Sequence, residues 1–443
     1  QNVFRHLLVV LRRLVPSTLR DFAEMAIFIT VISLVVITGY LQGAITIAIA
    51  TPAILGLGTV VFLQAVMACF TLTGLFSLST LTLFWQLRME QENHCPTSGP
   101  TVTAIVPVHR DVAVLDRSVE SLLASRYDDL RVVIVAEPND DASIRRAREL
   151  GDHERVEVLV NTRYAGSKAG AINYAAEVTD SEYLAVFDAD ECVDPRFISA
   201  AVDKLDDADI VQGRTIPEPN GVIETIAYYE SVILGDLSQR LLTLVTDFTL
   251  AASRTVVMRR SAFEAVEGYD TAMLTEDYDF AFSCYEESLD VHEQLTHAST
   301  IEAAHTATDW WGQRKRWMTG YAQVFHDLVT DCRSPQNYRS LLSPLICAGS
   351  VFGNLFLLSV VSKLLVLVVN NQATWLVLPV ATLVLSALAM RAYDAHGGRL
   401  DTVGVGWLLM PVIIPLYSLV GIKAFVEYVC SWDGEWYSVA KGV

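Results

Sequence analysis

Basic side chains are scarce in this sequence of 443 residues, which has 32 Lys and Arg against 51 Asp and Glu, and only six of the 32 are Lys. The net charge of -19 excludes a nucleic-acid-binding protein, because phosphate contacts need a basic surface. A hydrophobic content of 52% excludes a disordered tail. The shortage of Lys on so acidic a chain predicts a protein that works in high salt, as in a halophilic archaeon; an ordinary acidic cytosolic domain is the alternative.

Cysteine is also sparse, and its pattern excludes two kinds of structure. The seven cysteines are scattered, odd in number and without a CxxC pair. This excludes a small disulfide scaffold and argues against a zinc site. We therefore expect a reducing compartment, with the soluble part of the chain facing the cytoplasm.

Long hydrophobic runs lie near both ends of the chain and leave a polar middle. Residues 86–340 carry a net charge of -21, whereas the flanking blocks hold few charges. We predict four parts: an amphipathic helix at 1–20, transmembrane helices in 21–86, a cytoplasmic domain with interface helices at 87–340, and transmembrane helices with a Trp-containing tail at 341–443.

The two hydrophobic blocks differ in how clearly they define crossings. The first is expected to form two helices, near 24–49 and 56–85, with arginines on both flanks that place these flanks on the cytoplasmic side. The second holds apolar segments near 345–369, 374–391 and 403–429. Three crossings would leave the C-terminus outside, but the last segment contains prolines and charges and could instead bend back.

Between residues 101 and 215, short β-rich runs alternate with helical stretches. Strands are expected at 102–108, 130–136, 156–160, 183–187 and 210–212, with helices between them at 112–125, 142–150, 168–178 and 195–205. This alternation predicts an α/β fold with a doubly wound, mostly parallel sheet, whose ligands bind beyond the carboxyl ends of the strands. The polar residues after the strands are therefore candidates for a site: 107–111, 137–141, 161–168 and 188–190.

Two of these loops suit the phosphates of a nucleotide. Asp188 and Asp190 directly follow an apolar strand, where carboxylate oxygens suit Mg²⁺ or Mn²⁺, although a solvated acidic loop would have the same sequence. Lys168 stands at a glycine-flanked helix start, where a cation and free N–H groups favour a nucleotide's anionic end.

Two further motifs lie beyond residue 270. The first is Thr-Glu-Asp at 275–277, whose Asp277 could act as a base or cap a helix that begins at Tyr278. The second is Gln-Arg-Lys-Arg-Trp at 313–317. Its arginines suit phosphate oxygens and its Trp suits a sugar ring, but a positive patch beside the next membrane helix is the alternative.

The order of these motifs resembles that of the membrane-embedded glycosyltransferases of family 2, which include the cellulose, chitin and hyaluronan synthases. The resemblance covers about residues 100–320. It implies a GT-A-like domain inserted between transmembrane blocks. It also implies a set of roles: donor binding by Pro107, Glu137, Lys168, Asp188, Gln313 and Arg316, a Mg²⁺ or Mn²⁺ ion held by Asp188 and Asp190, base catalysis by Asp277, and acceptor stacking on Trp317.

The resemblance further implies inverting transfer of a sugar from a nucleotide sugar, a UDP-sugar rather than a GDP-sugar, to a growing glycan that a multi-pass cell-membrane protein exports. Residues 249–252 lack the family's usual aromatic pair at the acceptor mouth, which weakens the case for a standard channel. Single transfer onto a membrane lipid, as in ceramide glucosyltransferase-like enzymes or onto polyprenyl phosphate, is the alternative. A transporter or channel that only binds nucleotide is the alternative from another class.

Three other features keep open interpretations. Residues 222–245 suit either an interface helix or an ordinary domain helix. His305 either lies by the metal or is structural. Residues 432–437 resemble the Trp-containing tail that closes over the donor in relatives, with Lys441 as its only basic candidate. A closing tail would require a cytoplasmic C-terminus, which conflicts with three crossings.

Overall fold

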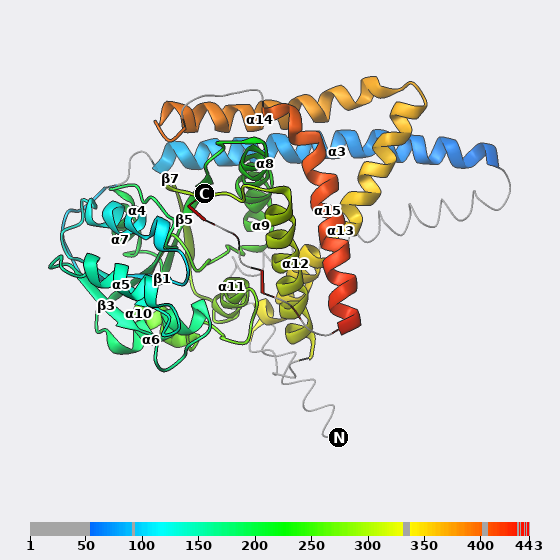
Figure 1. Ribbon diagram of the computed structural model, residues 1–443. Helices are drawn as coiled ribbons and strands as arrows, with labels where there is room; N and C mark the ends of the chain where they lie inside the picture. The colour runs from blue at the N-terminus through cyan, green and yellow to red at the C-terminus, as the bar shows by residue number, and fades with distance from the viewer. Residues whose placement is uncertain are drawn as a thin grey trace. The chain divides into compact units, whose positions relative to one another are not determined.

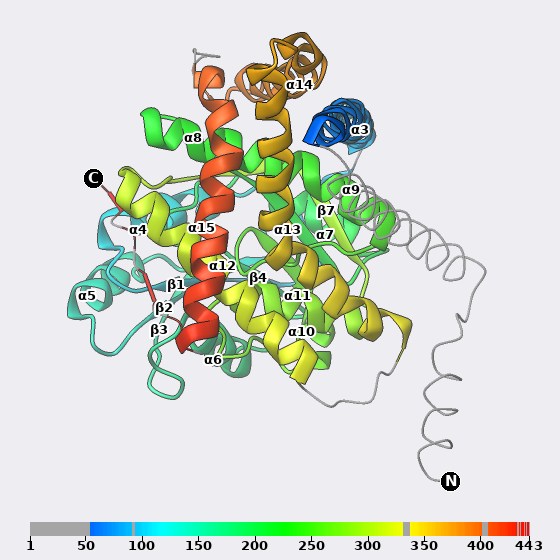
Figure 2. The same cartoon turned by 90° about the vertical axis from the view of Figure 1, so that its right-hand side faces the viewer.

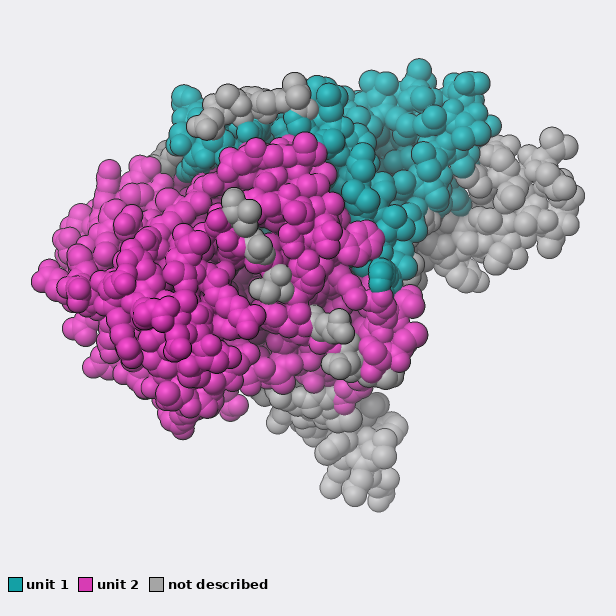
Figure 3. All heavy atoms as spheres, viewed as in Figure 1, with its two compact units in different colours: residues 1–84, 229–248, 332–423 teal, residues 85–228, 249–331, 424–443 magenta. Residues whose placement is uncertain are grey.

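The computed structural model describes residues 54–90, 94–330, 337–400 and 406–431, together with residues 434, 436, 437, 439, 441 and 442. The helices expected at 1–20 and near 24–49 lie outside the described residues. The chain divides into two compact units, which Figure 3 colours separately. Unit 1 comprises residues 1–84, 229–248 and 332–423, and unit 2 comprises residues 85–228, 249–331 and 424–443.

Unit 2 is built on a mixed seven-stranded sheet (Figure 1). Its strands are β1 (Val102–Val108), β2 (Leu130–Ala136), β3 (Val156–Val160), β4 (Tyr183–Val186), β5 (Ile210–Pro217), β6 (Val256–Arg259) and β7 (Val291–Ile301), in the order β3-β2-β1-β4-β6-β5-β7. Only β6 is antiparallel to its neighbours. The predicted α/β fold with a mostly parallel sheet is confirmed.

Helices pack on this sheet through alternate residues of the strands. Val102, Ala104 and Val106 of β1 belong to a buried core that also contains apolar residues of α4 (Val112–Leu123), α5 (Asp141–Leu150) and α7 (Phe197–Lys204). Because neighbouring residues of a strand point to opposite faces, the intervening residues of β1 face away from this core. Further helices of unit 2 are α6 (Lys168–Val178), α10 (Arg260–Ala265), α11 (Glu276–Glu286) and α12 (Ala307–Thr330).

The expected strands match the structure closely, except at the end of the sheet that holds β5. The strand expected at 210–212 continues to Pro217, because β5 passes through an irregularity at Gly213 and then pairs with the second half of β7. The strand expected at 183–187 ends at Val186. The sequence pattern predicts neither β6 nor β7.

The run expected to be helical at 222–245 is helical throughout. It consists of α8 (Val222–Glu230), the π-helical segment η1 (Ser231–Leu237) and α9 (Ser238–Thr246). Asp247 follows in the left-handed conformation, with φ of 58°, and its carboxylate accepts a hydrogen bond from Arg339. The interface position of this run stays a prediction.

Unit 1 contains η1, α9 and most of a set of long apolar helices. The long helices are α3 (Ile54–Glu90), α13 (Tyr338–Val369), η2 (Ala373–Leu376) with α14 (Val377–His396), and η3 (Gly406–Leu409) with α15 (Met410–Ser431). Three stretches of the described residues are long and apolar enough to cross a membrane: Phe62–Glu90, Ala373–His396 and Gly406–Ser431. These helices fall where the sequence predicts hydrophobic crossings.

Small and polar residues hold the helices of unit 1 together. Thr80 of α3 donates a hydrogen bond of 2.6 Å to Ser386 of α14. Gly421 of α15 packs against Asn354 of α13, and Figure 2 shows these two helices side by side. Contacts of this kind are typical of helices that pack within a bilayer, where apolar burial alone does not favour association.

Candidate active site

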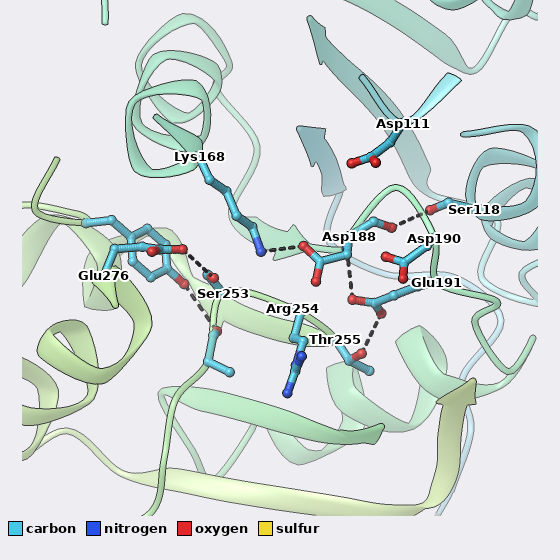
Figure 4. A network of polar contacts seen from close by, with 12 residues as sticks. Asp111, Ser118, Lys168, Asp188, Asp190, Glu191, Ser253, Arg254, Thr255 and Glu276 are labelled. Carbon is cyan, nitrogen blue, oxygen red and sulfur yellow. Dashed lines mark hydrogen bonds and ion pairs between the residues drawn. The ribbon is translucent and has the colours of Figure 1, made fainter. Parts of the chain in front are cut away.

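Two neighbouring parallel strands bring carboxylates to one edge of the sheet. Asp111 stands in the turn after β1, and Asp188 and Asp190 follow β4. Because β1 and β4 pair in parallel, with Ile105 opposite Val186, their carboxyl ends meet. Figure 4 shows the three carboxylates there, with Lys168 reaching Asp188.

Asp188 is the centre of a network of charged groups. Its carboxylate accepts a hydrogen bond from the Lys168 ammonium, and its backbone carbonyl accepts one of 3.0 Å from Ser118. Burial opposes ionisation of Asp188, but the positive charges of Lys168, Lys441 and Arg254 outweigh it and lower the pKa of the carboxyl. Asp188 is therefore an anion that is already neutralised in part by fixed cations.

Asp190 and Asp111 share a second cation. The Lys441 ammonium lies 2.8 Å from Asp190 Oδ1 and 3.9 Å from Asp111 Oδ2. Burial lowers the pKa of Lys441, yet the charges of Asp190, Asp188 and Asp111 raise it overall. Burial raises the pKa of Asp111, against the opposing charge of Lys441. The three carboxylates thus form a site that stabilises a positive charge.

These carboxylates suit a Mg²⁺ or Mn²⁺ ion. Their oxygens are the hard ligands that such ions prefer, and a cationic group of the protein already lies among them. The described residues contain no group of three or more His, Cys, Asp or Glu arranged to hold a metal by itself. An ion held here by Asp188 and Asp190 would therefore need further ligands, such as water or the oxygens of a diphosphate.

Lys168 is positioned by a capped helix start. Ser167 is the N-cap of α6, and its hydroxyl accepts a hydrogen bond of 3.0 Å from the N–H of Gly170. Glu137 fixes the preceding loop, because its carboxylate accepts hydrogen bonds of 2.8 Å from Asn161 and 2.7 Å from the N–H of Gly166. Both oxygens of Glu137 are thus used within the loop, and its donor contact stays a prediction.

The acidic motif at 275–277 lies at the start of α11. This helix begins at Glu276 with Thr275 as its N-cap, so the interpretation of Asp277 as cap of a helix starting at Tyr278 is wrong. Ser253 donates a hydrogen bond of 2.9 Å to Glu276, and burial together with the charge of Asp277 raises the pKa of Glu276. Asp277 is only partly buried, which leaves it accessible in a way that Glu276 is not.

Arg316 of α12 faces the same acidic groups. Burial lowers its pKa, and the charges of Glu276, Asp277 and Asp188 act against this effect. Its guanidinium lies 4.2 Å from the centre of the Trp436 ring, and its Nε is buried without a hydrogen-bond partner. A half-buried guanidinium whose Nε donor has no partner is suited to an incoming anion.

The neighbours of Arg316 in the motif at 313–317 are engaged within the protein. Arg314 donates a hydrogen bond to Gln313, and its guanidinium lies 4.7 Å from the centre of the Trp317 ring. Lys315 pairs with Glu427 at 2.5 Å. One face of Trp317 is therefore covered by Arg314, and its contact with an acceptor stays a prediction, as does the contact of Gln313 with a donor.

Pro107 and His305 lie at the borders of this region. Pro107 is the second-last residue of β1 and pairs with Val135 of β2. His305 Nδ1 lies 2.9 Å from Glu224, and both interpretations of this histidine stay predictions.

Comparison of the chain with known proteins identifies the domain that carries these residues. Residues 100–320 match the family model of the Glycosyltransferase like family 2. They are a glycosyltransferase family 2 domain. The predicted family and enzyme class of this domain are thereby confirmed.

Individual relatives of the family 2 domain are distant. Over 263 residues the chain is 24% identical to a beta-monoglucosyldiacylglycerol synthase of Trichormus variabilis, which covers 58% of this chain and 56% of that protein. It is 23% identical over 242 residues to the cellulose synthase 1 catalytic subunit [UDP-forming] of Komagataeibacter xylinus, which covers 52% of this chain and 32% of that one. The chain spans little more than half the length of the first of these relatives, and less of the second.

Among solved structures, the chain is similar to the mannosyltransferase PcManGT from Pyrobaculum calidifontis. The identity is 14%, the TM-score is 0.47, and the match covers 82% of this chain and 99% of the other.

Two acidic residues of the family 2 domain have no role predicted from the sequence. Asp111 stands there only as part of a polar loop. Glu191 is fully buried, accepts a hydrogen bond of 2.8 Å from the N–H of Asp188 and another from Thr255, and has its pKa raised by burial and by the charge of Asp188. Its position directly after Asp190 was the only signal, and in an acidic chain that signal is weak.

Described residues from the end of the chain contact the family 2 domain. Tyr437 donates a hydrogen bond of 2.9 Å to Asp309, and the N–H of Gly442 donates one of 2.8 Å to Glu302. Trp436 and Lys441 contact Arg316 and Asp190, so described residues that follow α15 lie at the candidate active site.

Proposed function

We propose that the family 2 domain transfers a sugar from a nucleotide sugar to an acceptor hydroxyl, with inversion at the anomeric carbon. The observation that carries this proposal is the convergence of three kinds of group in one place. Two acidic residues that suit a metal, Asp188 and Asp190, follow β4, and the ammonium of Lys168 pairs with Asp188. Arg316 and the partly exposed Asp277 interact electrostatically with each other and with this pair.

The donor side would be formed by the acidic ligands and the cations. Asp188 and Asp190 would hold Mg²⁺ or Mn²⁺, which supplies charge neutralisation for a departing diphosphate. Lys168 and Arg316 would bind the diphosphate from the protein side, and the unpaired Nε of Arg316 is available for it. The cellulose synthase relative is described as UDP-forming, which supports a UDP-sugar as the donor.

The acceptor side would be formed at the start of α11. Asp277 would take the proton of the attacking hydroxyl, because it is partly exposed while Glu276 is buried and bonded to Ser253. Direct attack from the face opposite the departing diphosphate inverts the anomeric centre. Trp317 would provide an apolar surface for the acceptor ring.

We further propose a growing glycan as the acceptor, in a multi-pass membrane protein whose family 2 domain is cytoplasmic. The three apolar helices support the membrane location. The described residues after α15 belong to unit 2 and contact its family 2 domain, which supports an even number of crossings between α12 and these residues and argues against three. A lipid acceptor for a single sugar is the second candidate, supported by the name of the beta-monoglucosyldiacylglycerol synthase relative.

An assay of the purified full chain in detergent tests these proposals. The protein is supplied with Mn²⁺, a panel of UDP- and GDP-sugars, and both oligosaccharide and lipid acceptors. Mass spectrometry of the products gives their size. Products with many added sugars support the glycan acceptor, and a lipid with one added sugar supports the second candidate. If wild type and Asp277→Asn bind nucleotide equally well and neither transfers sugar to any acceptor, both acceptor proposals are contradicted. A non-enzymatic role would then be supported.

A further inference from the structure

Described residues that follow α15 contact the groups to which we assign the metal and the diphosphate. We refer to residues 434, 436, 437, 439, 441 and 442 as the strap. They contact the rest of unit 2 at several separate points, so their position does not depend on any single interaction.

The first important contact of the strap is Lys441. Its ammonium lies 2.8 Å from Asp190 and 3.9 Å from Asp111, and it also lowers the pKa of Asp188. Asp190 is only 3% exposed, so its charge is poorly screened by solvent. A buried carboxylate of this kind requires a cation, and in this structure a protein side chain supplies it.

The second important contact is Trp436. Its ring lies 4.2 Å from the guanidinium carbon of Arg316, within the range of a cation–π interaction. Arg316 is the cation that we assign to the diphosphate. The strap therefore contacts both groups that a metal-bound diphosphate would need. The ammonium of Lys441 contacts Asp190, and the ring of Trp436 contacts Arg316.

Two anchors hold the strap between and beyond these contacts. The Tyr437 ring lies against Gly312 of α12, where a methyl group would come within 2.5 Å of the ring carbon Cζ, and the hydroxyl of Tyr437 donates to Asp309. Gly442 donates its N–H to Glu302. These contacts fix Lys441 close to the carboxylates, which gives the ammonium a high effective concentration there.

We propose that the strap is an intramolecular competitor of the metal-bound donor, with the Lys441 ammonium and a divalent cation excluding each other at Asp190 and Asp111. This inference rests on the proposed function. It follows that the ammonium must leave the carboxylates before a divalent cation can bind, and that the strap lowers the metal affinity of the resting protein.

The test measures Mn²⁺ binding to the full chain in detergent without nucleotide, by electron paramagnetic resonance of the free ion. Lys441→Met keeps the length of the side chain and removes its charge, and it should bind Mn²⁺ about tenfold more tightly than wild type, because a tethered competitor acts at an effective concentration in the millimolar range. Lys441→Arg keeps the charge and should retain the weaker affinity. Lys204→Met, in the last turn of α7, is the matched control and should also behave as wild type.

A second readout follows the strap itself by hydrogen exchange. Addition of Mn²⁺ and UDP to wild type should speed the exchange of amides within 434–442, since Lys441 is displaced. Equal or weaker Mn²⁺ affinity in Lys441→Met, or exchange that does not respond to Mn²⁺ and UDP, overturns the proposal. Absence of Mn²⁺ binding from every variant also overturns it. Sugar transfer that persists without a metal would then show that the proposed transfer stands and the competition does not.

Discussion

Gly320 permits the close approach of α12 to α11, and its replacement by Ala should separate the two helices at the candidate active site. A methyl group at Gly320 would lie 2.5 Å from Cγ2 and 2.9 Å from Cβ of Thr275, and closer still to its hydroxyl oxygen. Ordinary contact begins at 3.4 Å, so the helices must move apart by roughly 1 Å. Thr275 is the N-cap of α11, and this movement therefore shifts the start of α11.

The consequences for stability and for catalysis should differ in size. Overpacking costs about 1–3 kcal/mol, and the better helix propensity of Ala offsets about 1 kcal/mol of it. Arg316 precedes Gly320 by one helical turn and lies on the same face of α12, while Asp277 lies two residues after Thr275. A misplacement of about 1 Å between reacting groups lowers a rate roughly hundredfold. We therefore expect Gly320→Ala to fold with a modest loss of stability and to lose most of its turnover.

The assay compares sugar transfer, nucleotide affinity and melting temperature in Gly320→Ala and wild type. Gly349→Ala is the matched control, because Gly349 also lies in a long helix, α13, but has nothing within 4 Å of an added methyl group. The control should retain wild-type turnover. Turnover of Gly320→Ala within about threefold of wild type, in a folded protein, would refute the argument that this contact sets the geometry of the site.

Three further predictions concern the proposed roles of individual residues. Asp190→Ala should abolish turnover and metal-dependent nucleotide binding measured by calorimetry, and full wild-type activity in EDTA would contradict the metal assignment. Asp277→Asn should keep donor affinity while losing roughly a hundredfold or more in rate; an equal loss of affinity in a binding assay would make Asp277 a ligand contact or structural. Arg316→Ala should weaken UDP binding as well as transfer, whereas Trp317→Ala should keep UDP binding and lose transfer more than donor hydrolysis; equal loss of UDP binding in both would contradict the division into donor and acceptor sides.

The central sheet and its edge were predictable because they depend on local patterns. β1, β2 and β3 have the boundaries expected from their apolar runs, and α6 begins at Lys168 as its flanking Ser and Gly predict. A parallel sheet brings the carboxyl ends of β1 and β4 together whatever the rest of the chain does. The positions of Asp188 and Asp190 could therefore be predicted from the alternation of strands and helices and from the Asp-Ala-Asp motif that follows β4.

Contacts made between residues far apart in the sequence could not be predicted in this way. The pairing of Lys441 with Asp190 joins residues that are 251 positions apart, and no periodicity relates them. The same holds for Arg316 and Trp436. The strand β7 was missed because its polar residues, such as Gln294 and Ser299, are buried and do not alternate with apolar ones. In each case tertiary packing determines the contact or the strand, and the local sequence pattern does not predict it.

The distribution of lysine connects the composition of the chain with the chemistry of its site. Unit 2 contains four of the six lysines, at positions 168, 204, 315 and 441, and two of the four contact the carboxylates beside β4. If the acidic composition reflects adaptation to high salt, salt would screen the exposed carboxylates of the domain. Partly buried pairs such as that of Lys168 with Asp188, whose side chains are 21% and 25% exposed, are screened less than fully exposed pairs. Exposed lysines can therefore be lost from the surface while Lys168 and Lys441 are kept, because their pairs with carboxylates are partly shielded from solvent.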